Sequence, residues 1–303
     1  GLYPLLQFLG TPSAIVSQSY LYIATIVNGV AVTFAYNLCA GLLRAVGDSL
    51  AALYFLIIAA ILNILLDLYF ITQLHLGVQS AGIATIIAQG ISALLCLLYI
   101  RKKVPFLLPH RKDFVWDKEL YQDLLSQGLA MGLMTSIVSI GTVILQSAIN
   151  QLGTTIISAQ VAARRIMSFA VLPITAIASS ITTFISQNFG AEQFHRIKKG
   201  VTIANFLSWV WSVLVAALLF FTSPSITSFI SGSTNPDLIA NASLYLQISS
   251  CFYPILASLI ILRNALQGMG KKLTPLTSSF IELFGKIFFV LWIIPHTGYM
   301  GVI

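Results

Sequence analysis

The chain alternates long apolar stretches with short polar connections. Each stretch has about 20 residues or more, enough for a helix to cross a hydrocarbon core about 30 Å thick. Ten-residue segments with a period of two do not occur, so a β-barrel is not expected. The pattern predicts eight membrane-spanning helices, at residues 18–43, 50–73, 79–100, 124–149, 156–184, 200–222, 240–266 and 275–295.

The composition supports this interpretation. Hydrophobic residues make up 57% of the 303 and charged residues only 8%, whereas roughly a quarter of a soluble domain is charged. We therefore expect an all-α, polytopic transmembrane bundle in contact with the lipid bilayer. The motifs HExxH, GxSxG, GxGxxG and the P-loop are not found, and the three cysteines lack the spacing of a metal or redox site. The sequence thus predicts a protein that is not an enzyme and has no cofactor.

The basic residues predict an orientation. Thirteen of the sixteen Lys and Arg follow alternate predicted spans, and the connections around positions 75, 153, 231 and 296 have none. Basic loops are typically cytoplasmic, so we expect a plasma-membrane protein with these loops inside. Because the net charge of +7 is not gathered in one patch, we expect no nucleic-acid partner. The thirteen residues are Arg44, Arg101, Lys102, Lys103, Arg111, Lys112, Lys118, Arg196, Lys198, Lys199, Arg263, Lys271 and Lys272.

An internal repeat indicates a second level of organisation. Residues 42–71 align without a gap on residues 265–294, with Gly47 on Gly270 and an offset of 223. Six spans separate the copies, so the repeat unit is six helices in the same orientation, as in one class of secondary transporter. The repeat predicts a fragment without the first three helices and the last. The lobes are then 1–101, the second half of the N-terminal lobe, and 119–303, the C-terminal lobe, joined by a cytoplasmic loop at 102–118.

One carboxylate interrupts the second predicted span. Asn63 and Asp67 are four residues apart and share one helix face. A hairpin centred on residue 76 would bring Thr85 level with Asp67, and Gln89 level with Asn63. Amide, carboxylate and hydroxyl oxygens suit a small hard cation such as Na⁺, so Asn63, Asp67 and Thr85 form a candidate metal site.

Two alternatives to a metal site are open. Asp67 could carry a proton, or it could only bond to a neighbouring helix. A central Asp costs about 2.5 to 3.5 kcal/mol on insertion scales, and a polar neutral residue would fill a structural role at lower cost. The sequence therefore favours a functional Asp67.

Other polar side chains mark a candidate substrate cavity. The fourth span has hydroxyl and amide residues at helical spacing, in a stripe about 22 Å long that would suit the wall of a wet cavity or a tight helix contact. Pro173 and Pro254 are expected to break their helices. The cavity candidates, for which packing is the alternative, are Tyr36, Asn37, Gln89, Met131, Thr135, Ser139, Thr142 and Gln146.

Charges in the last predicted span are interpreted as structural. Glu282 and Lys286 are four residues apart, which suits an ion pair on one helix face. The repeat places Lys286 where the first copy has Asn63, and Val290 where it has Asp67. The two halves of the repeat are therefore not chemically equivalent.

Several motifs, taken in order, resemble one family. They are LLRAVGDS, ILNILLD, GIATIIAQ, INQLGTTIISAQVAARRI, SQNFGAEQFHRIKKG and LQGMGKK. This series resembles the multidrug and toxic compound extrusion (MATE) transporters over nearly the whole chain. The resemblance implies twelve helices in two six-helix lobes, alternating access, and export driven by inward movement of sodium or protons.

The resemblance also assigns roles to residues. Members like this one bind the cation with an Asn and an Asp four apart on the fifth helix, a Thr on the sixth and a Tyr on the fourth. These fall on Asn63, Asp67, Thr85 and Tyr22. A further essential Asp lies on the family's first helix, which has no counterpart here, so the implied site is incomplete.

The functional hypothesis is a monomeric cation-coupled antiporter that exports amphipathic, often cationic, drugs. One alternative is a lipid-linked oligosaccharide or lipid flippase, which would need several cations in its cavity, where Arg164, Arg165 and Lys286 are the candidates. The other is an ion channel, but no continuous selectivity element is visible.

Overall fold

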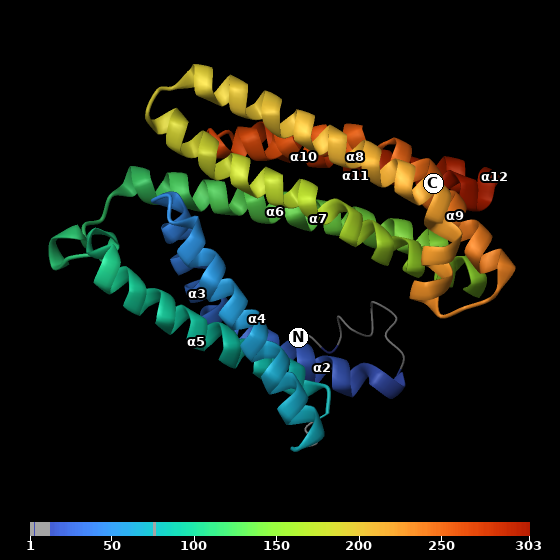
Figure 1. Ribbon diagram of the computed structural model, residues 1–303, viewed down its shortest axis with the longest axis horizontal. Helices are drawn as coiled ribbons and strands as arrows, with labels where there is room; N and C mark the ends of the chain where they lie inside the picture. The colour runs from blue at the N-terminus through green and yellow to red at the C-terminus, as the bar shows by residue number, and fades with distance from the viewer. Residues whose placement is uncertain (1–2, 4–12, 75–76) are drawn as a thin grey trace. The chain divides into compact units, whose positions relative to one another are not determined.

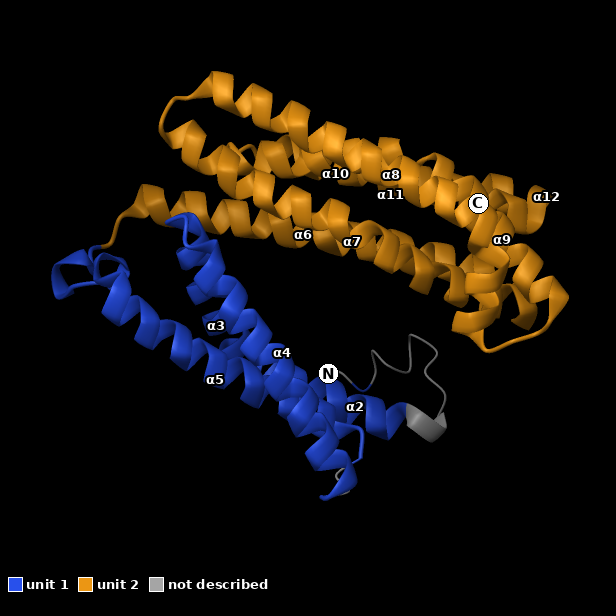
Figure 2. Ribbon diagram, viewed as in Figure 1, with its two compact units in different colours: residues 1–115 blue, residues 116–303 orange. Residues whose placement is uncertain are grey.

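The structure is a computed structural model, and it describes residues 3, 13–74 and 77–303. All regular secondary structure in this part of the chain is helical (Figure 1). The chain forms two compact units, residues 1–115 and 116–303 (Figure 2). The division between them falls inside the connection expected at 102–118.

The helices of unit 1 are α2 (Ser13–Asn28), α3 (Val30–Ala45), α4 (Ser49–Thr72) and α5 (Gln79–Lys103), followed by the 3₁₀ turns η1 (Pro105–Leu107) and η2 (Arg111–Asp113). Those of unit 2 are α6 (Lys118–Asn150), α7 (Thr154–Gly190), α8 (Phe194–Ser231), α9 (Pro236–Cys251), α10 (Tyr253–Gly268), α11 (Leu273–Phe288), a π-helical turn η3 (Phe289–Ile293), α12 (Ile294–Thr297) and η4 (Gly298–Gly301). Asp48, Asp117 and Asn235 cap the N-termini of α4, α6 and α9 by accepting backbone N–H groups.

The described helices confirm the expected spans. Six helices are long and apolar enough to cross a membrane, and the number rises to eight if the bent pairs α2–α3 and α9–α10 each form one span. Only 11% to 33% of the most apolar window of each of the six is buried inside the structure. Large apolar surfaces of this kind are expected where helices face lipid.

Two proline predictions have different outcomes. The pair α9–α10 bends by 56°, and Pro254 lies in the first turn of α10, where its missing N–H costs nothing. The break expected at Pro173 is wrong, because α7 runs without interruption through it. Trp211 of α8 donates its indole N–H to the carbonyl oxygen of Ala170 (2.8 Å). A neighbouring helix thus supplies a hydrogen bond in the turn that Pro173 weakens.

The helix bounds reproduce the internal repeat. The bounds of α3 and α10 differ by 223 residues at both ends. The preceding bends, 48° and 56°, fall at Gly29 and Phe252, which have the same offset. The two units therefore share a bent helix pair followed by a turn into the next helix, although the bend in unit 1 was not expected from the sequence.

The turn after each bent pair is also the same. Gly47 and Gly270 have φ values of +90° and +72°, a conformation that favours glycine. The amide after each glycine donates to the carbonyl five residues earlier, at 2.9 Å in both copies. This is the Schellman motif that ends a helix. The aligned glycines of the repeat are thus conformationally equivalent.

Each unit has its own apolar core. In unit 1 the core joins α3, α4 and α5, and in unit 2 one cluster joins α7, α8, α9 and α10 while another joins α7, α8 and α10. The core residues of unit 1 are Tyr36, Cys39, Ala40, Leu43, Ala51, Ala52, Ala93, Cys96 and Ile100. Small residues predominate, which lets membrane helices approach closely.

Candidate cation site

The centre of the candidate site is a hydrogen bond between α4 and α5, which pack side by side. The Asn63 amide Nδ2 donates to the Thr85 hydroxyl oxygen (3.2 Å), and that hydroxyl donates to the carbonyl of Ala81 (2.8 Å). The donor group of Asn63 is therefore engaged by Thr85. Its amide oxygen is left as an acceptor, the kind of ligand that a hard cation requires.

Asp67 lies one turn further along α4, about 6 Å by helical rise. Its side-chain oxygen Oδ1 is buried and has no hydrogen-bond partner in the described part of the chain. An unpaired buried carboxylate oxygen is costly and calls for a specific explanation. Asp67 thus offers an acceptor for a cation or a proton beside the Asn63–Thr85 pair.

The expected pairing across this hairpin is wrong by about one helical turn. Thr85 bonds to Asn63 instead of lying level with Asp67, and Gln89 accepts from the Thr33 hydroxyl of α3 (2.6 Å). The prediction assumed ideal helices up to residue 76, whereas α4 ends at residue 72 and α5 begins at residue 79. Residues 75–76 of the turn lie outside the described residues, and the two arms are not symmetric about it.

Tyr22 reaches this region through its backbone. A Cβ built at Gly82 would lie 3.1 Å from the Thr25 side chain and 3.6 Å from the Tyr22 carbonyl oxygen. Gly82 thus permits α2 to cross α5 closely, one turn before Thr85. The Tyr22 side chain is 38% exposed, and within the described residues no hydrogen bond joins it to Asn63 or Thr85.

The donor set is selective in its chemistry. Among the described residues, no group of three or more His, Cys, Asp and Glu side chains could hold a metal ion. The cluster instead combines one carboxylate with neutral oxygens. Such a set fits a monovalent hard cation or a proton better than a transition metal, which prefers nitrogen or sulfur.

The cavity candidates of unit 1 do not form one surface. Tyr36 is only 7% exposed and packs in the core, which favours the packing alternative. Asn37 is exposed and donates to the carbonyl of Thr33 (2.9 Å). Gln89 is held by the Thr33 hydroxyl.

The polar stripe of α6 is largely accessible within unit 2. Its three hydroxyls each donate to a carbonyl four residues earlier in the same helix, so their oxygens remain free to accept. Gln146 accepts from Arg164 of α7 (3.1 Å) and donates to Asn150 (2.9 Å). The stripe consists of Thr135, Ser139, Thr142, Gln146 and Asn150, and the further cavity candidate Met131 is exposed on the same helix.

The charged residues of unit 2 form a triad instead of a pair. The Lys286 ammonium donates to one carboxylate oxygen of Glu282 (2.8 Å), and the Arg263 guanidinium donates to the other (3.0 Å). Arg263 also bonds to Ser278 at 2.9 and 3.0 Å. Arg263 was expected among the basic residues of the cytoplasmic connections, but it lies inside α10. Its position within the predicted span 240–266 was the signal that could have revealed it.

A second missed contact lies at the start of α4. The carboxylate of Asp48 accepts the backbone N–H of Ala51 (3.1 Å) and the hydroxyl of Tyr99 on α5 (2.8 Å). This contact fixes the start of the helix that positions Asn63 and Asp67. The aligned position in the second copy is Lys271, so the repeat gave no hint of it.

Comparison with known proteins points to one family. The chain is 29% identical over 281 residues to the probable multidrug resistance protein YpnP of Bacillus subtilis (strain 168), covering 92% of this chain and 62% of YpnP. It is 27% identical to a protein named FAD transporter from Shewanella oneidensis, covering 80% of this chain and 54% of that protein. The chain thus spans less than two thirds of the length of these relatives.

A solved structure has the same fold. An outward-facing multidrug resistance MATE family transporter of the MOP superfamily superposes with a TM-score of 0.88 at 21% identity, covering all of this chain and 68% of that one. The family model named MatE matches residues 2–69 and 130–292. The chain, with its bent helix pairs and membrane-length helices, therefore belongs to the MatE family of multi-pass membrane transporters.

Proposed function

We propose that the chain belongs to a cation-coupled antiporter that exports amphipathic drugs, and that its driving ion binds at Asp67. The observation that carries the proposal is the unpaired buried oxygen of Asp67 beside the Asn63–Thr85 hydrogen bond. An oxygen left unpaired in this way is an acceptor open to a cation or a proton. The names of YpnP and other relatives as multidrug resistance proteins support the direction of transport.

The coupling follows from charge neutralisation. When a sodium ion or a proton reaches Asp67, the carboxylate no longer carries an uncompensated charge among apolar helices, and the helices can pack differently around it. Asn63 and Thr85 hold their side chains in place through their mutual bond, so they present oxygens without further ordering. If ion and drug each favour a different arrangement of the protein, the inward ion movement drives drug export.

We also propose an inner-membrane location with the basic connections in the cytoplasm. Arg101, Lys102 and Lys103 end α5, and Lys198 and Lys199 lie near the start of α8. Positive charge in these places matches the cytoplasmic bias of membrane proteins. The working unit in this proposal is a monomer.

The test measures efflux of a fluorescent organic cation from vesicles of cells that express the protein at its full natural length. Sodium and proton gradients are imposed separately, on the wild type, Asp67→Asn and the control Asp113→Asn, an exposed carboxylate in η2. We expect one gradient to drive efflux by the wild type and the control, and Asp67→Asn to lose this drive. Undiminished gradient-driven efflux by Asp67→Asn would refute the proposal.

A second candidate is export of an anionic amphiphile. In the helices of unit 2, Arg263 and Lys286 share one carboxylate, Glu282, while Arg164 donates to the neutral Gln146, so these basic side chains outnumber their acidic partners. One relative is named FAD transporter, and a flavin nucleotide is such an anion. The same vesicles tested with a flavin nucleotide distinguish the two candidates. The second candidate requires gradient-dependent export of the flavin nucleotide and no such export of cationic dyes.

A further inference from the structure

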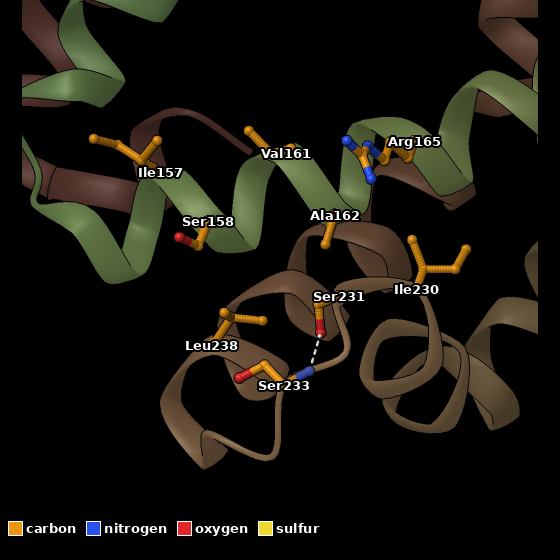
Figure 3. A pocket seen from close by; sticks show the side chains of 9 residues that line it. All are labelled: Ile157, Ser158, Val161, Ala162, Arg165, Ile230, Ser231, Ser233 and Leu238. Carbon is orange, nitrogen blue, oxygen red and sulfur yellow. Dashed lines mark hydrogen bonds between the residues drawn. The ribbon is translucent and has the colours of Figure 1, made fainter. Parts of the chain in front are cut away.

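A cavity of about 440 Å³ lies in unit 2 where α7 passes the turn between α8 and α9 (Figure 3). Its wall combines one arginine, several serines and aliphatic side chains. We propose that this cavity binds the phosphate group of a membrane phospholipid, with Arg165 as the anchor. The proposal is independent of the exported substrate and of the coupling ion.

Arg165 is the charged group of the cavity. It lies 11 residues into α7, about 17 Å from the start of the helix by helical rise, and its side chain is exposed. Within the described residues it forms no hydrogen bond or ion pair, whereas the adjacent Arg164 donates to Gln146. An arginine in an apolar span is costly unless an anion or polar group accompanies it. The guanidinium therefore has five donors for an anion that does not come from its own unit.

The turn between α8 and α9 supplies a fixed hydroxyl to the same cavity. The backbone N–H of Ser233 donates to the Ser231 hydroxyl oxygen (3.2 Å), and the Asn235 N–H donates to the Ser233 hydroxyl oxygen (3.2 Å). Gly232 closes α8 in the left-handed conformation, with φ of +63°. The Ser233 oxygen is thus held in place while its own proton is left to donate. Figure 3 shows the Ala162 side chain directed from α7 toward this turn.

The remainder of the cavity favours a lipid over free phosphate. Ile157, Val161 and Leu238 line it, and these aliphatic side chains match the glycerol backbone and first methylenes of a lipid. Phe229, which precedes the lining residue Ile230 in the sequence, is 87% exposed, as expected for a helix that faces hydrocarbon. Guanidinium pairs well with phosphate because its planar fork of N–H donors can bond two phosphate oxygens at once.

One carboxylate lies close to the cavity in sequence. Asp237 follows the turn in the first helical turn of α9 and is exposed, but no ion pair joins it to Arg165 in the described structure. If Asp237 were the true partner of Arg165, the cavity would have no need of an external anion. Asp237→Asn would in that case free the arginine and strengthen lipid binding. In the proposed arrangement the carboxylate does not contribute, so Asp237→Asn should change lipid binding little.

The test titrates the purified protein in detergent with phosphatidylglycerol and with diacylglycerol, which lacks the phosphate, and counts bound lipid by native mass spectrometry. We expect Arg165→Gln to weaken phosphatidylglycerol binding by about fivefold or more and to leave diacylglycerol binding unchanged. Arg165→Lys should fall between, because it keeps the charge and loses the fork. Arg196→Gln is the control, because Arg196 is an exposed arginine at the other end of α8, and its phosphatidylglycerol binding should stay within about twofold of the wild type.

Three outcomes would overturn the proposal. Equal phosphatidylglycerol binding by Arg165→Gln and the wild type would remove Arg165 as the anchor. Equal displacement of the bound lipid by soluble glycerol phosphate at matched concentration would show that the site holds free phosphate and not a lipid. If Asp237→Asn loses as much phosphatidylglycerol binding as Arg165→Gln, the loss reflects a general change of the local surface and not removal of a specific anchor. Melting temperatures of all variants confirm that each is folded.

Discussion

Removal of Glu282 should destabilise unit 2 more than removal of either cation that it binds. Glu282 accepts from Arg263 at 3.0 Å and from Lys286 at 2.8 Å. The side chains are 28% exposed for Glu282, 14% for Arg263 and 24% for Lys286. The isosteric change Glu282→Gln keeps the volume and removes the charge, so two partly buried cations lose their counter-ion at once.

The magnitude follows from these contacts. Hydrogen bonds to charged groups contribute roughly 1.5 to 3 kcal/mol each, and breaking a fully buried pair costs about 3 to 5 kcal/mol. Because the triad retains some solvent contact, we expect Glu282→Gln to cost about 2 to 3 kcal/mol. Lys286→Met should cost only about 1 kcal/mol, because Arg263 and Glu282 stay paired and the methionine can keep the contact of the Lys286 stem with Gly141.

The assay is reversible unfolding in mixed micelles. It gives the free energy of unfolding as a function of the fraction of denaturing detergent. The double variant Glu282→Gln with Lys286→Met completes a cycle. We expect it to be no less stable than Glu282→Gln alone, since one unpaired cation has gone. Equal losses of unfolding free energy in Lys286→Met and Glu282→Gln would contradict the role of Glu282 as a shared counter-ion. So would a double variant whose loss equals the sum of the two single losses.

Two further predictions use the same unfolding assay. Gly268→Ala should cost about 2 kcal/mol, because its Cβ would lie 2.7 Å from a backbone carbonyl oxygen of α7. In the control Gly128→Ala the Cβ meets no atom within 4 Å, so this change should be neutral or stabilising. Similar losses in both variants would contradict close packing of α7 and α10. Tyr99→Phe should cost about 1 kcal/mol through its bond to Asp48, and Asp48→Ala about 2 kcal/mol because it also loses the cap of α4. A larger loss in Tyr99→Phe than in Asp48→Ala would count against this arrangement.

The helical architecture could be predicted because it depends on local patterns. Apolar runs of membrane length locate the spans, and Gly47 and Gly270 mark the equivalent turns of the repeat through their need for positive φ. The bend at Gly29 could not be predicted in the same way. At Gly29 the side chain of Ile86 from α5 lies where a Cβ would be, and such a contact between distant segments is not visible in the local sequence.

The candidate site shows the same limit. Helical periodicity alone puts Asn63 and Asp67 on one face of α4, and the described helix is continuous through both. The partner on α5 depended on the geometry of the connection at residues 73–78, so Thr85 was matched to the wrong member of the pair. Arg263 was missed for a related reason, because charge counting at the end of a span does not reveal which carboxylate a side chain reaches.

Binding of the driving ion at Asp67 should be measurable as an ion-dependent stability of the purified protein. Thermal unfolding is measured across a sodium series at constant ionic strength and across a pH series, for the wild type, Asp67→Asn and Asp113→Asn. A ligand that binds only the folded state raises stability in proportion to the logarithm of its concentration above Kd.

Sodium or protons should stabilise the wild type and Asp113→Asn, and this dependence should disappear in Asp67→Asn while the protein stays folded. An undiminished dependence in Asp67→Asn would place the ion-binding site elsewhere.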